Sequence, residues 1–140
     1  MTERVIAVDL GITWDPNVPE AQLTATDNGE TWLSLLARDD DADQRPVTLL
    51  WRGSVATRME PPNDEAAEGH RLYDAGLRDV VWVGEVLDSN LVIEFERLNR
   101  VHPRRDAARY AGLRHWVVPL KECTVEVVAR PVEALRGTAR

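Results

Sequence analysis

The sequence predicts an α+β fold in which about seven mostly antiparallel strands form a curved sheet or a partly closed barrel. Three observations lead to this prediction. Short runs of alternating apolar and polar residues recur along the chain, Gly and Pro residues separate them, and apolar residues follow a helical period in residues 91–101. We therefore expect one amphipathic helix packed on the sheet and a short connecting helix. All of these belong to a single domain, residues 1–136, followed by a frayed tail, residues 137–140.

The first strands are predicted from alternation and from one turn motif. In residues 5–14, every second residue from Ile6 to Trp14 has a large apolar side chain, which is typical of a half-buried strand. Residues 21–26 and 31–37 are also strand-like and flank the pair Asn28-Gly29. Because Asn-Gly favours a type I′ turn, these two strands should form a hairpin.

An acidic run follows at residues 39–43, which contain four aspartates. Carboxylates this close together could bind calcium, but the run lacks the central Gly and the distal Glu of an EF-hand loop. We therefore expect a solvated hairpin tip. Residues 47–58 then alternate up to Gly53, which predicts a fourth strand with a bulge or a bend.

The connection after this strand holds the first candidate for chemistry. Pro61-Pro62 ends the strand, and residues 63–65 supply a helix cap and acidic first-turn residues, so a short helix or helical turn should follow. His70 could act as a general base held in one tautomer by Asp64 or Glu65. It could also simply pin the long connection through hydrogen bonds, and we favour this second role.

Residues 79–87 predict a fifth strand, and residues 88–90, Asp-Ser-Asn, favour the start of a helix. One face of this helix consists of apolar residues at helical spacing: Leu91, Phe95, Leu98 and Val101. This face should pack on the sheet. Pro103 should end the helix, because the residue before a proline avoids the helical conformation.

Residues 97–115 hold six arginines and one aspartate, a local charge of +5 in a chain whose net charge is −7. The candidate residues for binding an anion or a partner are Arg97, Arg100, Arg104, Arg105 and Arg109, together with Tyr73. The arginines could clamp a phosphate or a carboxylate, or steer nucleic acid. We favour the alternative that they lie against the acidic surface of the protein itself or of a partner.

Residues 116–127 predict a second hairpin, with Lys121-Glu122 as its turn. Its opposed residues are Leu120 with Cys123, Val118 with Val125 and Trp116 with Val127, and together they form one apolar face. On the opposite face, Glu126 would be a diagonal neighbour of His115. Cys123 would then be a buried apolar residue and not a nucleophile.

Several classes of site lack their signatures. The sequence contains no phosphate-loop, dinucleotide-binding, zincin, nucleophile-elbow or dithiol motif. The histidines, at positions 70, 102 and 115, do not have metal-ligand spacing, so we expect no metal and no cofactor. The acidic charge argues against nucleic acid as a partner, and no apolar run is long enough for a membrane span. The opening residues do not resemble a signal peptide and there is only one cysteine, so we expect a cytoplasmic protein.

The leading hypothesis is a non-enzymatic cytoplasmic interaction or accessory protein, an immunity-type or regulatory partner that binds another protein. It is based on the small acidic chain, the missing catalytic motifs, and an abundance of Trp and Arg, which are enriched in interface hot spots.

The alternative is a small enzyme or a ligand-binding protein for an anionic small molecule. Its pocket would lie between loop 61–77 and turn 102–106. There His70, with Asp64, or His102 would act as an acid or a base, and an arginine of the turn would hold the anion.

Overall fold

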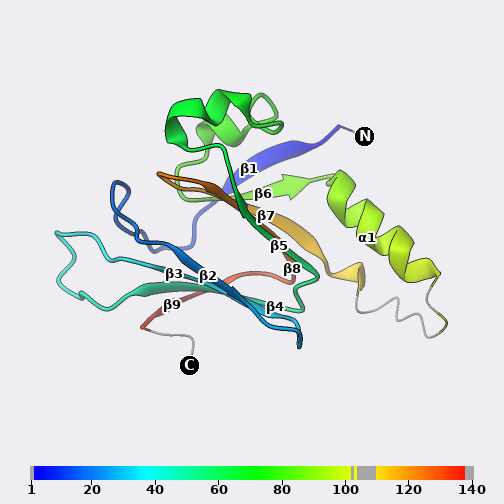
Figure 1. Cartoon of the computed structure of the whole chain (residues 1–140), viewed down its shortest axis with the longest axis horizontal. Helices are drawn as coiled ribbons and strands as arrows, with labels where there is room; N and C mark the ends of the chain where they lie inside the picture. Colours follow the sequence, from blue (N-terminus) through cyan, green and yellow to red (C-terminus); the bar gives the residue numbers. More distant parts are fainter. Residues whose placement is uncertain (1, 102, 104–109, 138–140) are drawn as a thin grey trace.

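The structure is a computed structural model of the whole chain, and it describes residues 2–101, 103 and 110–137. Within these residues, nine strands form two antiparallel sheets that pack against each other (Figure 1). One sheet has five strands in the order β1-β6-β7-β8-β5, and the other has four in the order β2-β3-β4-β9. The predicted α+β class with mostly antiparallel strands is confirmed, although the strands are divided between two sheets and no closed barrel forms.

The strands are β1 (Arg4–Val8), β2 (Gln22–Ala25), β3 (Glu30–Leu35), β4 (Val47–Arg52), β5 (Ala56–Glu60), β6 (Val83–Leu87), β7 (Arg114–Pro119), β8 (Thr124–Ala129) and β9 (Glu133–Arg136). Two short 3₁₀ helices, η1 (Asp64–Gly69) and η2 (Leu77–Asp79), precede β6, and the helix α1 (Asn90–Arg100) follows it.

The main core lies between the two sheets, where their apolar faces meet. Leu33 and Trp51 from the four-stranded sheet and Val118 and Val127 from the five-stranded sheet are at most 1% exposed. Burying one such aliphatic side chain stabilises the fold by roughly 1.5–3 kcal/mol. The core therefore holds the two sheets together.

Both predicted hairpins are confirmed. β2 and β3 pair across Asn28-Gly29, and Gly29 has the positive φ of 87° that such a turn requires. In the second hairpin, β7 and β8 place Trp116 opposite Val127 and Val118 opposite Val125. Residues 39–43 lie in the connection between β3 and β4, where a hairpin tip was expected.

The predicted first strand, residues 5–14, is too long. β1 ends at Val8, and the chain turns at Gly11, which has a φ of 69°. Trp14 is nevertheless buried in the core, because a loop can also direct its side chain inwards. The apolar alternation in the sequence therefore extends past the end of the strand that actually forms.

The predicted fourth strand, residues 47–58, is divided in two. Gly53 has a φ of 61°, and the chain crosses there from β4 in one sheet to β5 in the other. This division and the additional strand β9 account for nine strands where about seven were predicted. The strand predicted at residues 79–87 begins only at Val83, because Leu77–Asp79 forms η2.

Residues 61–82, which we call the helical segment, cover the outer face of the five-stranded sheet. Asn63 caps η1 as predicted, since its side chain accepts a hydrogen bond from Ala66 N at 3.1 Å. Leu72 and Leu77 pack with Val117 of β7 in a second core cluster. The five-stranded sheet is thus apolar on both faces.

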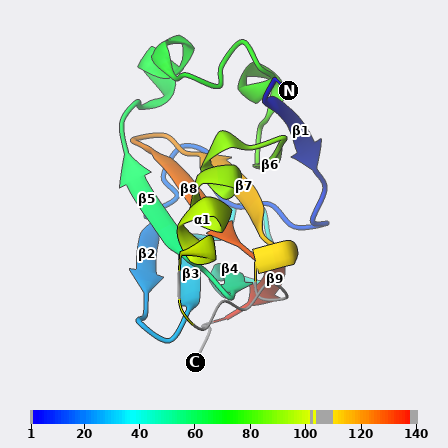
Figure 2. The same cartoon turned by 90° about the vertical axis from the view of Figure 1, so that its right-hand side faces the viewer.

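Helix α1 lies beside β7 (Figure 2). It begins after Ser89, which caps it by accepting a hydrogen bond from Val92 N at 3.2 Å. Of the predicted apolar stripe, Leu91 and Phe95 are half-buried, but Leu98 and Val101 are 58% and 82% exposed. Only the first half of the stripe packs on the sheet.

The C-terminal residues were expected to fray from residue 137. Gly137 donates a backbone hydrogen bond to Pro46 O at 2.7 Å, which continues the contacts of β9. Residues 138–140 lie outside the described residues.

Candidate functional site

Glu126, in the middle of β8, is a buried carboxylate on the outer face of the five-stranded sheet. Its side chain is only 1% exposed. Its Oε1 accepts hydrogen bonds from Arg71 Nη2 at 2.6 Å and His115 Nε2 at 2.7 Å. Its Oε2 accepts from Arg71 Nη1 at 2.9 Å and His70 Nε2 at 3.3 Å. These donors fill the acceptor positions of the carboxylate.

The environment of Glu126 keeps it ionised. Burial alone raises the pKa of its carboxyl group, because burial disfavours the charged form. The hydrogen bonds from His115 and Arg71, together with the charge of Arg71, outweigh burial and hold this pKa well below its usual range. The same contact raises the pKa of Arg71. The two groups therefore form an ion pair at neutral pH.

Both ring nitrogens of each histidine are hydrogen-bonded, and for His70 the partners also fix the tautomer. His70 Nδ1 accepts a hydrogen bond from Leu72 N at 3.0 Å, so its proton is on Nε2 and is donated to Glu126. His115 Nε2 lies 2.7 Å from Glu126 Oε1, and its Nδ1 is hydrogen-bonded to Ser89 Oγ at 2.8 Å. The bonds through Ser89 link Glu126 to the start of α1.

This arrangement leaves neither histidine with a free ring nitrogen. The described part of the chain holds no group of three or more His, Cys, Asp or Glu residues that could bind a metal. The carboxylate partner of His70 is Glu126, while Asp64 pairs with Lys121 at 3.0 Å. Catalytic roles for His70 and Asp64 stay predictions. The hydrogen bond from His70 to Glu126 of β8 helps to hold the helical segment on the sheet.

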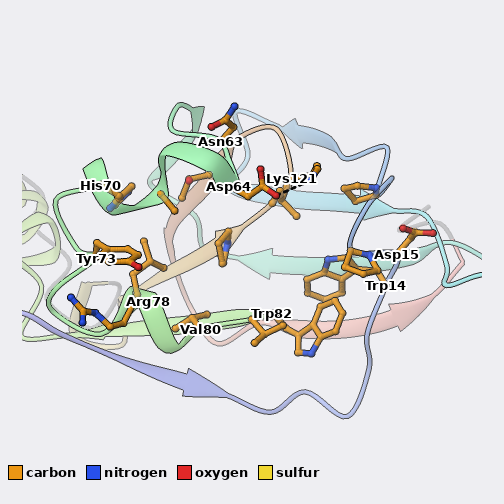
Figure 3. Close-up of a pocket in the computed structure, with 18 residues that line it drawn as sticks. Trp14, Asp15, Asn63, Asp64, His70, Tyr73, Arg78, Val80, Trp82 and Lys121 are labelled. Carbon is orange, nitrogen blue, oxygen red and sulfur yellow. Dashed lines mark ion pairs between the residues drawn. The ribbon is translucent and has the colours of Figure 1, made fainter.

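Three of the predicted site residues, His70, Asp64 and Tyr73, line one pocket of about 320 Å³ (Figure 3). The pocket lies between the helical segment, the loop that follows β1 and the turn between β7 and β8. Its apolar lining comes from Trp14, Pro16, Pro19, Ala67, Leu77, Val80, Val81, Trp82, Pro119 and Leu120.

The two ends of the pocket differ in character. At one end, the Arg78 guanidinium lies 4.9 Å from the centre of the Tyr73 ring and forms an ion pair with Asp74. At the other end, Trp14 and Trp82 form an edge-to-face pair with ring centres 5.1 Å apart and an angle of 77°. Figure 3 shows these two groups on opposite sides of the pocket.

A different surface lies on α1. Ile93, Arg97, Arg100 and Val101 are spaced i, i+4, i+7 and i+8, so they share the side of the helix directed away from the sheet, and we call them the α1 outer face. Ile93 and Val101 are 57% and 82% exposed. Arg97 and Arg100 are also exposed, and neither forms an ion pair with another described residue.

The remaining candidates of the arginine cluster, Arg104, Arg105 and Arg109, lie outside the described residues, as does His102. The pocket predicted between loop 61–77 and turn 102–106 therefore has only one of its sides described. In both Figure 1 and Figure 2, the C-terminal end of α1 lies farther from the helical segment than the start of α1 does.

Part of these sites was predictable from the sequence. The diagonal pair of His115 and Glu126 was predicted and is confirmed, with its 2.7 Å hydrogen bond. The contacts of Glu126 with Arg71 and His70 were missed, although a lone Glu within the apolar run of β8 indicates a buried charge that needs partners. The pairing of Trp14 with Trp82 had no signal, because these residues are far apart in the chain.

Comparison with known proteins identifies no relative: no protein-family model, curated protein or solved structure matches the chain. Among the helices of the described residues, none has the length and apolar character needed to cross a membrane. The function must therefore be argued from the geometry of the sites.

Proposed function

We propose that this protein is an interaction protein that binds an acidic protein partner through the α1 outer face. The observation that supports this is the exposure of two aliphatic side chains, Ile93 at 57% and Val101 at 82%, beside two arginines that form no ion pair with another described residue. Burying apolar surface gains about 25 cal/mol per Å². Arg is enriched at protein interfaces and in their hot spots, and the exposed aliphatic side chains beside it supply apolar surface to bury.

The pattern on α1 also indicates the chemistry of the partner. A helix that presents aliphatic anchors at i and i+8 fits an apolar groove. Arg97 and Arg100 lie between these anchors and can form bidentate hydrogen bonds with carboxylates at the edge of such a groove. Glu94 and Glu96 equal these two arginines in number within α1, so the attraction for an acidic partner is confined to Arg97 and Arg100 on the outer face.

We further propose that the protein is not an enzyme and that it acts in the cytoplasm. The histidines His70 and His115 and the carboxylate Glu126 are engaged with one another, so they are poorly placed to exchange protons with a substrate. Cys123 is a free thiol, as is usual for a protein of a reducing compartment.

The test is capture of partners from lysate of the source organism, followed by binding measurements with the purified partner. Ile93→Asp and the double change Arg97→Glu with Arg100→Glu should each weaken binding at least about tenfold. A matched control is Arg58→Glu, which reverses an exposed arginine of β5 and should leave binding unchanged. The proposal fails if the partner binds both α1 variants as tightly as the native protein, or if the captured molecule is a nucleic acid.

A further inference from the structure

We propose that the pocket beneath the helical segment binds a neutral, planar heteroaromatic small molecule, independently of the α1 outer face. The volume of about 320 Å³ lies at the lower end of the range typical of ligand sites, roughly 300–1,000 Å³. It is large enough for one or two fused rings. Ten of the eighteen lining residues are apolar and eight are polar or charged, so the pocket offers both apolar surface and hydrogen-bonding groups to a ligand.

The aromatic end of the pocket is preorganised for a flat ring. Trp14 is fixed in the core with 2% exposure, and its edge-to-face contact holds Trp82 in place. Trp82 is only half-buried, so part of its ring remains available at the pocket. A planar ligand placed against it would extend the aromatic pair, and such contacts contribute beyond the area that they bury.

The charged groups around the pocket already have partners, either an oppositely charged side chain or, for the Asp15 carboxylate, backbone N–H groups, which argues for a ligand without net charge. Lys121 pairs with Asp64 at 3.0 Å, and Arg78 pairs with Asp74. The Oδ1 atom of Asp15 accepts two backbone N–H bonds, at 2.9 and 2.8 Å. An anion or a cation would have to compete with these contacts, whereas a neutral ring would not.

Two polar groups can orient a ring that carries nitrogen or oxygen at its edge. The Asn63 side chain uses its oxygen to cap η1, so its amide NH₂ is left without a partner among the described residues. The Tyr73 hydroxyl likewise has no partner in the described part of the chain. In Figure 3 both residues belong to the border of the pocket. Such groups select a heteroaromatic ring over a plain hydrocarbon.

The test uses three probes that share one ring and differ in charge: indole, indole-3-acetate and tryptamine. Binding is followed by ligand-observed NMR and by the shifts of the tryptophan indole N–H signals. We expect indole to bind with a dissociation constant on the order of 1 mM or tighter, as its size allows. It should shift the signals of Trp14 and Trp82, and neither charged probe should bind more tightly than indole.

Two neighbouring alanines of η1 provide a matched pair of variants. Ala67 lines the pocket, so Ala67→Trp should fill it and weaken indole binding about tenfold or more. Ala66 is exposed and does not line it, so Ala66→Trp should bind indole like the native protein. Ile93→Asp should also leave indole binding unchanged, which separates this site from the α1 outer face.

Three results would overturn the proposal. One is the absence of binding of all three probes to the native, folded protein. Another is tighter binding of indole-3-acetate or of tryptamine than of indole, which would indicate a site for a charged ligand. The third is shifts confined to tryptophans other than Trp14 and Trp82, a measurement on the native protein that does not depend on whether Ala67→Trp folds.

Discussion

Replacing Glu126 with Gln should strongly destabilise the protein at pH 7. The amide keeps the size of the side chain, but it removes the charge and directs an NH₂ group at the N–H donors of Arg71 or His115. Breaking a buried ion pair costs roughly 3–5 kcal/mol of unfolding free energy. We expect the lower end, about 3 kcal/mol, because the Arg71 side chain is 46% exposed and can regain water.

The pH dependence of this loss has a defined sign. The pKa of Glu126 in the folded protein is below its value of about 4.3 in an unfolded chain. The stability that ionisation contributes is therefore fully present above that value and is lost as the pH falls towards the folded pKa. The difference in stability between the native protein and Glu126→Gln should consequently shrink between about pH 5 and pH 3.

The assay is urea unfolding at pH 7 and pH 3, followed by tryptophan fluorescence and far-ultraviolet circular dichroism. Glu122→Gln is the control, since it makes the same chemical change at an exposed turn between β7 and β8. A Glu126→Gln protein within about 0.5 kcal/mol of native stability at pH 7 would refute the reasoning. So would a deficit of equal size at both pH values.

Three further predictions concern single positions. Gly76→Ala should lower the free energy of unfolding by about 3 kcal/mol, because Gly76 has a φ of 129° and a Cβ there would clash with a backbone oxygen of β1. Its control is Gly69→Ala, which has open space around it and should be near neutral in the same urea titration. Ser89→Ala should cost about 1–3 kcal/mol, since it removes both the cap of α1 and a partner of His115. Amide hydrogen exchange should then be faster in α1, and unchanged exchange there would contradict this role. Burial raises the pKa of the Cys123 thiol, so iodoacetamide should modify the folded protein more slowly than the unfolded chain, and equal rates by mass spectrometry would contradict this.

The features that the sequence predicted correctly are set by residues close together in the chain. The Asn28-Gly29 turn, the Asn63 cap and the Ser89 cap each depend on contacts within a few residues. The register of the β7–β8 hairpin follows from alternation across a short turn, and it also gave the diagonal pair of His115 and Glu126. Local physical chemistry is sufficient for features of this kind.

The features that were missed depend on residues far apart in the chain. His70 had acidic neighbours at 64 and 65, yet its partner is Glu126, 56 residues away. Alternation indicates only that a side chain is buried on one side, so it could not distinguish the strand β1 from the loop that carries Trp14. For the same reason it could not show that Gly53 moves the chain from one sheet to the other.

The contacts of Glu126 explain why this carboxylate is itself no part of the binding surfaces that we propose, although His70 borders the pocket. A buried carboxylate is tolerated only while its donors remain, so the helical segment, β7 and β8 must keep their positions around it. A ligand that entered this cluster would have to replace bonds from Arg71 as well as from two histidines. A ring bound in the proposed pocket, or a groove bound over Ile93, would displace water from apolar surface without breaking these bonds.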